Sequence, residues 1–406
     1  MFSRPVSFVV AGAAGAATLT AASAPSPLYP VYQRLWGLSA FTLTTVFAVY
    51  VFALLVSLLT VGSLSDRVGR RPVASTALVL LAVGTFLFTV ADGPGGLVAA
   101  RIVQGLAVGA ATGTTTALVM DSAPGPRTGS IVSSAVPTFG IALGAALAGA
   151  LVEFAPHPRE LVFWVLAVVY LLLAALVWWV PERARTTTSP EPLWRSLLPS
   201  AGVPATTRPV FFGLLPSIAA TWALGGLYLS LGSSVIGSVL GVHDHFVVGL
   251  VLAVFFTAGT CGTALSALLP PRARQGFGLG TLALGVLTTI EAMSSSSLPL
   301  YVTGSVIAGL GFGATFRFAV DALGKAAPPA QRGQVFATMY IVSYLAFSVP
   351  ALAAGLAVAR FGLEPTVVAY GVFDVALVAV AGVTAFVRTR RTTTEEAAER
   401  QASNRP

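Results

Sequence analysis

The stretch "GSLSDRVGRRP", Gly62–Pro72, decides how this sequence of 406 residues is interpreted. It holds four charged residues in eleven positions, whereas only 9% of the whole chain is charged and 55% is hydrophobic. One apolar run precedes the stretch and another follows it. A short charged turn between two apolar runs is typical of a loop at a membrane surface.

The apolar runs predict a polytopic membrane protein. The mean hydropathy of +0.85 is far above that of an average soluble domain. About 20 predominantly apolar residues cross the hydrocarbon core of a bilayer as a helix, and the runs predict twelve such helices. We place these helices at residues 6–26, 40–61, 73–91, 97–120, 130–152, 161–180, 210–237, 246–269, 276–293, 299–323, 334–358 and 365–387.

The basic residues predict the orientation of these helices. Eighteen of the 23 Lys and Arg residues fall on one side of the predicted topology. Those on or near the other side are Arg34, Arg101, Arg159 and Arg360. Lys and Arg collect in cytoplasmic loops, so we expect a protein of the cell inner (plasma) membrane with both termini in the cytoplasm. The net charge of +8 does not indicate nucleic-acid binding, because no basic stripe is interleaved with aromatic residues.

The composition changes abruptly between Pro181 and Pro209, where proline, threonine and charged residues replace the apolar runs. Six predicted helices lie on each side of this linker. We expect an N-terminal six-helix bundle, a cytoplasmic linker, a C-terminal six-helix bundle and a disordered cytoplasmic tail, at residues 1–180, 181–209, 210–388 and 389–406.

A faint internal repeat supports two equivalent halves. A shift of the sequence by 204 positions places Gly105 and Gly109 on Gly309 and Gly313. Each half has an even number of predicted spans, so the duplicated halves run in the same direction. The fold class that follows is an all-α membrane protein of twelve transmembrane helices, in two six-helix bundles related by a pseudo-two-fold axis along the membrane normal.

Two motifs carry a resemblance to a known family. The loop has the form Gly-x-Leu-x-Asp-x-x-Gly-Arg-Arg, and "RIVQG" at Arg101–Gly105 has the form Arg-x-x-Gln-Gly. The chain thereby resembles the major facilitator superfamily, whose signatures stand between the second and third helices and in the fourth helix. With twelve spans and a central linker, the resemblance covers essentially the whole chain. It implies a secondary transporter that works by alternating access and needs no cofactor or metal. An enzyme is not expected, since no catalytic constellation and no phosphate-binding loop is present.

The resemblance implies that the loop is a latch on the cytoplasmic side. Asp66 would rest at the positive N-terminal end of the helix that begins near Gly333, and Arg70 would pair with Asp121 at the end of helix four. The alternative, a simple topology anchor, explains the arginines but leaves Asp66 and the glycines unexplained. The latch residues implied are Gly62, Asp66, Gly69, Arg70, Arg71 and Asp121.

Ionisable groups inside predicted spans are candidates for function. In relatives the residue that matches Arg101 takes part in proton coupling or substrate contact; the alternative is that Arg101 extends to the outer interface. Gln104 would form hydrogen bonds between helices or to the substrate. Arg317 and Asp321, one turn apart, predict an ion pair at the inner gate or a substrate contact. Asp374 predicts a packing role or a part in the proton pathway.

Aromatic residues on the expected cavity helices are candidate wall residues, although simple packing is the alternative for each. They include Tyr50, Trp222, Tyr228, Tyr340 and Tyr344. The same helices carry more arginine than matched acid, so a neutral or anionic amphiphile fits better than a strongly cationic drug. The histidines lie in expected outer loops, where they predict ordinary surface polarity.

The function we expect is proton-coupled efflux of a small amphipathic drug or metabolite. One alternative is uptake of a sugar or organic acid by symport or facilitated diffusion. The other is a membrane receptor that does not transport. The expected partners are the small-molecule substrate, protons and membrane lipids, with no nucleic acid, and the chain is expected to be a monomer.

Overall fold

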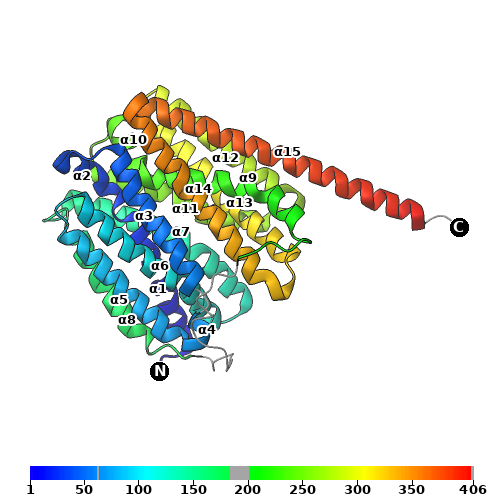
Figure 1. Cartoon of the computed structure of the whole chain (residues 1–406), viewed down its shortest axis with the longest axis horizontal. Coiled ribbons are helices and arrows are strands. Elements are labelled where there is room, and N and C mark those ends of the chain that lie inside the picture. The colour runs from blue at the N-terminus through cyan, green and yellow to red at the C-terminus, as the bar shows by residue number, and fades with distance from the viewer. Residues whose placement is uncertain (62–63, 183–200, 404–406) are drawn as a thin grey trace.

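The computed structural model describes residues 1–61, 64–182 and 201–403, and in these residues the chain is helical and contains no strand (Figure 1). The helices are α1 (Arg4–Ser23), α2 (Tyr29–Trp36), α3 (Ala40–Val61), α4 (Leu64–Val68), α5 (Arg70–Thr89), α6 (Pro94–Ser122), α7 (Pro126–Phe154), α8 (Leu161–Val177), α9 (Arg208–Ser230), α10 (Gly232–Ser238), α11 (His245–Leu268), α12 (Pro271–Ser294), α13 (Leu298–Ala326), α14 (Arg332–Phe361) and α15 (Leu363–Ser403).

The predicted spans correspond to these helices. Among the described residues, eleven helical segments are long and apolar enough to cross a membrane, and α8 is a shorter apolar helix of 17 residues. Together they occupy the twelve predicted runs. We call the end of the molecule where α8 ends and α9 begins the linker side, and the opposite end the far side.

The same helix contact occurs in both halves of the chain, as the predicted fold requires. Gly105 on α6 packs against the carbonyl oxygen of Tyr50 on α3, and Gly309 on α13 packs against the carbonyl oxygen of Phe255 on α11. A Cβ atom at either glycine would overlap that oxygen, so only glycine allows the two backbones to approach so closely. The sequence repeat is therefore also a repeat of packing, and the two-bundle fold is confirmed.

The first span differs from the single helix predicted for residues 6–26. The helix α1 ends at Ser23, a short 3₁₀ turn covers Ser26–Leu28, and α2 continues to Trp36. Pro25 and Pro27 cause this break, because proline has no N–H to donate and its ring obstructs the preceding helical turn. The break places the backbone of this segment at the far side, between the two bundles.

Two other boundaries differ from the prediction. The span predicted for residues 210–237 is divided at Leu231, with α9 before it and α10 after it. The last helix, α15, continues to Ser403 (Figure 1), past the end of the span predicted for residues 365–387.

The two bundles meet along a seam formed by α7 with α11 and by α3 with α14. At the far side, a Cβ atom on Gly249 would lie 2.9 Å from the Cα atom of Gly149, so the backbones of α11 and α7 touch. Closer to the linker side, the hydroxyls of Thr138 and Thr260 share a hydrogen bond of 2.6 Å. The seam is thus held both at its far end and near its middle.

Candidate functional site

Arg101 lies in the interior of the first bundle, about two turns from the far-side end of α6. Its side chain is 0% exposed. The Nη1 atom donates a hydrogen bond of 3.0 Å to the carbonyl oxygen of Ala21, and Nη2 donates one of 2.7 Å to the hydroxyl of Tyr29. The guanidinium therefore does not extend to a membrane interface, which rules out that alternative.

These two bonds hold together the broken first span. Ala21 is in the last turn of α1 and Tyr29 is the first residue of α2. The break leaves carbonyl groups at the end of α1 without partners in the helix, and a cation is favourable there. Arg101 thus donates a hydrogen bond to one of the carbonyl groups, that of Ala21, at the break that the prolines create.

Aromatic rings surround the Arg101 guanidinium. Its central carbon lies 5.0 Å from the ring centroid of Tyr50, 5.7 Å from that of Phe88 and 6.0 Å from that of Tyr29. Among the described residues no carboxylate pairs with Arg101, and its Nε atom has no hydrogen-bond partner. A buried cation with only neutral partners is costly, so this place favours binding of an anion.

Gln104 orients Arg101 from the next turn of α6. Its Oε1 atom accepts a hydrogen bond of 3.3 Å from Arg101 Nη1, and its Nε2 atom donates one of 3.0 Å to Thr85 Oγ1 on α5. Gln104 is also buried. The structure thus gives it contacts between helices, one of the two roles expected from the sequence.

Four aromatic residues of the second bundle form what we call the Trp222 cluster: Trp222, Phe316, Tyr344 and Phe347. The Trp222 ring centroid lies 5.3 Å from that of Phe316, 5.3 Å from that of Tyr344 and 5.4 Å from that of Phe347. Tyr340 stacks on Tyr344 at 6.1 Å. The indole Nε1 of Trp222 is buried and has no hydrogen-bond partner in the described part of the chain.

The Trp222 cluster and the Arg101 group meet across the seam. The ring of Phe47 on α3 lies 5.0 Å from that of Phe347, between centroids. Tyr50, which lies over the Arg101 guanidinium, is one turn further along α3. A positive group with an aromatic wall on one bundle therefore faces an aromatic wall on the other.

Tyr228 does not join this group. Its ring stacks on Phe255 at 4.0 Å, and its hydroxyl shares a hydrogen bond of 2.7 Å with Ser305. Its side chain is buried in the core of the second bundle, among α9, α11 and α13. The structure assigns it packing rather than a place beside Trp222.

The remaining acids lie apart from the Arg101 group. Arg317 Nε lies 3.7 Å from Asp321 Oδ2, one helical turn away on α13 and partly exposed. Asp374 on α15 is 0% exposed, and neither of its carboxyl oxygens has a hydrogen-bond partner among the described residues. The first arrangement is the ion pair that the sequence predicts; the second is an uncompensated buried carboxyl.

The latch loop is only partly described. Gly62 and the side chain of Asp66 lie outside the described residues. Gly69, the N-cap residue of α5, has a φ of 112°, a conformation that favours glycine. Arg70 forms an ion pair with Asp121 and donates a hydrogen bond of 3.1 Å from Nη1 to the carbonyl oxygen of Ala117.

Glu182, just beyond α8, completes this arrangement and was not predicted. Its Oε1 atom accepts hydrogen bonds from the backbone N–H groups of Arg70 and Arg71, the latter at 3.4 Å. A carboxylate at the N-terminus of α5 is favourable because free N–H groups and the positive end of the helix dipole meet there. The guanidinium Nε and Nη2 of Arg71 are buried without a partner in the described residues.

A second polar group, also not predicted, joins the bundles at the far side. The Nδ1 atom of His245 lies 3.0 Å from Glu153 Oε2, and its backbone N–H donates to the same oxygen at 2.9 Å. Arg34 Nη2 lies 3.4 Å from His245 Nε2. We call Arg34, Glu153 and His245 the far-side triad. His245 is the first residue of α11, after the helix cap Asp244, and not a loop residue as expected.

Comparisons with known proteins agree with this architecture. The family model described as Major Facilitator Superfamily matches residues 11–349. A bacterial homologue of the human lysosomal transporter Spinster, solved in an inward-facing and unoccupied conformation, has a TM-score of 0.76 at 16% identity; the match covers 94% of this chain and 96% of that one. The xylose transporter XylE from Escherichia coli, in an inward open conformation, has a TM-score of 0.74 at 16% identity, over 93% and 96% of the two chains.

Curated relatives match over shorter lengths. The 3-(3-hydroxy-phenyl)propionate transporter of Escherichia coli K12 is 35% identical over 142 residues, 34% of each protein. CsbC of Bacillus subtilis, named for metabolite transport, is 26% identical over 311 residues, 70% of this chain and 63% of that protein. The gentisate transporter of Corynebacterium glutamicum is 33% identical over 89 residues, 22% and 20% of the two. Each match spans less than two thirds of the relative.

Proposed function

The chain belongs to the major facilitator superfamily of membrane transporters, and from this premise we propose that it carries a small amphipathic organic anion by proton-coupled alternating access. It is a multi-pass membrane transporter and not an enzyme. The observation that carries the proposal is Arg101, a buried guanidinium with no carboxylate partner among the described residues.

The arrangement around Arg101 supports an acidic substrate with an apolar or aromatic body. The guanidinium would hold the carboxylate, and the rings of Tyr50 and the Trp222 cluster would contact the body of the molecule. In the present arrangement Arg101 is enclosed, so the bundles must move apart before a substrate reaches it. A strongly cationic drug fits poorly, because it would meet an uncompensated positive charge.

Two of the relatives are named for aromatic acids, 3-(3-hydroxy-phenyl)propionate and gentisate, and their names support the same class of substrate. An aromatic acid combines the two features that the site offers, a carboxylate for Arg101 and a ring for the aromatic walls. We therefore propose an aromatic acid as the first substrate to test.

The proposed cycle alternates between two seals. At the far side, the far-side triad and the contact of Gly149 with Gly249 hold the bundles together. At the linker side, which we propose faces the cytoplasm, Asp66 would reach the N-terminus of α14 when the far side opens. The pairing of Arg70 with Asp121 would hold the loop ready for that contact. The moving bodies are residues 1–180 and 210–388, and we propose that one chain is sufficient.

Proton coupling requires an acid that changes its protonation during the cycle. The candidates are Asp66, Asp321 and Asp374, with Arg101 as the charge that responds to substrate. The direction we propose is efflux in exchange for protons. Uptake of an organic acid together with protons is the second candidate.

Purified protein in liposomes tests both the substrate and the direction. A pH gradient of either sign is imposed, and benzoate-type acids, neutral analogues of the same shape and quaternary amines are supplied in turn. We expect proton movement on adding an aromatic acid and none with the amines. Accumulation of the acid in liposomes that are more acidic inside than outside indicates exchange for protons. Accumulation when the outside is more acidic indicates symport with protons. Transport of the amines alone would contradict the proposed site.

A further inference from the structure

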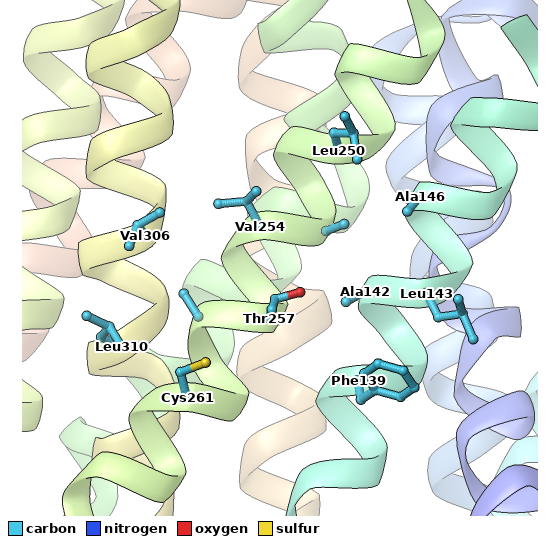
Figure 2. A pocket seen from close by; sticks show the side chains of 12 residues that line it. Phe139, Ala142, Leu143, Ala146, Leu250, Val254, Thr257, Cys261, Val306 and Leu310 are labelled. Carbon is cyan, nitrogen blue, oxygen red and sulfur yellow. The ribbon is translucent and has the colours of Figure 1, made fainter.

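An apolar groove of about 510 Å³ opens on the membrane-facing side of the seam (Figure 2). Figure 2 shows Ala142 on α7 toward Thr257 on α11, and Val254 on α11 toward Val306 on α13. No charged residue is among those that line it in the described chain. The volume is within the range of ligand-binding pockets in proteins.

The groove is an opening between two closed parts of the seam. On its far side the backbones of Gly149 and Gly249 touch, and on its linker side the hydroxyls of Thr138 and Thr260 are hydrogen-bonded. Between these points the side chains of α7, α11 and α13 line the groove. At both ends of the groove, therefore, the two bundles are in contact with each other.

The surroundings identify the occupant. All three helices that form the groove are among the segments long and apolar enough to span a membrane, and most of its residues lie from the middle of these helices toward their far-side ends, with Cys261 just past the middle of α11. The medium at this depth is lipid hydrocarbon. Lipid chains are continuous with the groove, whereas water would find almost no polar partner there.

We propose that this groove binds the acyl chain of a membrane lipid from the far-side leaflet. The chain would fill the space between α7 and α11 and stabilise the arrangement in which the seam is held at Gly149–Gly249 and Thr138–Thr260. This inference rests on the fold and not on the substrate proposed above. A second molecule of the protein is a poor occupant, because the groove is recessed between helices.

The chain's single cysteine, Cys261, lines the groove and is exposed, so it reports occupancy without any substitution. Wild-type protein in detergent is treated with a lipid-soluble maleimide, with and without dioleoyl phosphatidylglycerol at about ten times its Kd. Occupancy of about 90% should slow labelling about tenfold. Dihexanoyl phosphatidylglycerol, with the same headgroup and short chains, should protect weakly at the same concentration.

A filled groove provides the second measurement. Ala146→Phe places a ring into the space, and Leu284→Phe on the exposed surface of α12 is the matched control. Native mass spectrometry should find one retained dioleoyl lipid on wild type and Leu284→Phe, and several-fold less on Ala146→Phe. If Ala146→Phe does not fold, labelling of Cys261 in the wild-type chain still shows whether the lipid occupies the groove.

Three results would overturn the inference. They are a labelling rate of Cys261 that lipid does not change, equal protection by the short-chain lipid, and equal lipid retention by folded Ala146→Phe. Protection by an aromatic acid but not by lipid would also overturn it, because the groove would then belong to the substrate. Failure of transport with every acid would count against the proposed function alone.

Discussion

The guanidinium of Arg101 on α6 reaches the hydroxyl of Tyr29 at 2.7 Å, across the break between α1 and α2. The same side chain holds the carbonyl oxygen of Ala21 on the other side of that break. Tyr29 and Ala21, which precede Arg101 by 72 and 80 residues, are thus both bonded to its one charged group. The break in the first span and the charge in the fourth form one structural unit.

Arg101→Lys should reduce transport about tenfold or more. Lysine keeps the charge but lacks the planar fork that reaches Ala21 and Tyr29 together. Loss of one charge-assisted hydrogen bond costs about 1.5–3 kcal/mol, and 1.4 kcal/mol corresponds to a factor of ten. Initial rates in proteoliposomes measure the effect, with Arg159→Lys on the exposed far side as the control. Equal rates for wild type and Arg101→Lys would show that only the charge matters.

Tyr29→Phe should lower the free energy of unfolding by about 1.5–3 kcal/mol, because Arg101 Nη2 loses its partner in a buried place. Tyr32→Phe is the matched control. Tyr32 is equally buried, but its hydroxyl has no hydrogen-bond partner among the described residues. Thermal unfolding of the purified proteins in detergent compares them. The same loss of stability in both variants would contradict the role given to Tyr29.

The sequence predicted the spans well because apolar runs of membrane length have few alternative structures. The whole two-bundle fold follows from those runs, the linker and the repeat of Gly105 at Gly309. The breaks were harder to predict. Proline at positions 25 and 27 was visible, but the sequence does not show that Arg101, far along the chain, makes a broken helix stable there.

The site was predictable in part. The motif indicated Arg101 and Gln104, and the structure adds that both are buried and that Arg101 lies beside Tyr50. The far-side triad could not be predicted, because Arg34, Glu153 and His245 are separated by 119 and 92 residues and each alone has the pattern of a surface residue. Only the Asp244 cap before an apolar run indicates that His245 begins a helix.

Glu153→Gln should open the far side in a larger fraction of molecules. The substitution keeps the shape of the side chain but removes its charge beside His245 and Arg34. Since both partners of the ion pair are partly exposed, we expect a shift in population of about two- to fivefold. Spin labels on cysteines at Ser39 and His243, in a Cys261→Ser background, report the distance between the bundles there.

Glu291→Gln is the control for that measurement, since Glu291 is exposed at the far-side end of α12 within one bundle. We expect its distance distribution to match that of the parent chain. An unchanged distribution in Glu153→Gln would remove the far-side triad from the gate.

Gly249→Ala should separate α7 from α11 at the far side. The added Cβ atom would lie 2.5 Å from the carbonyl oxygen of Ala145 and 2.9 Å from the Cα atom of Gly149, so the backbones must move apart. Gly280→Ala on α12 is the control, because nothing lies within 4 Å of its Cβ position. In that control the free energy of unfolding should rise by up to about 1 kcal/mol, because alanine has a higher helix propensity than glycine. We expect slower transport in the first variant only, and identical rates would argue against the contact as a seal.

Exchange of the charges of Arg70 and Asp121 tests the latch. Arg70→Asp and Asp121→Arg each place like charges together at the linker-side end of α5 and α6, and each should slow turnover while leaving KM close to that of wild type. The double variant restores opposite charges and should recover part of the rate, by a coupling of about 1 kcal/mol. Recovery should be incomplete, because Asp at position 70 cannot donate to the carbonyl oxygen of Ala117 as Arg70 does. If the double variant is as slow as the sum of the two single changes predicts, the pair does not act as a unit, and the loop is a topology anchor rather than a latch.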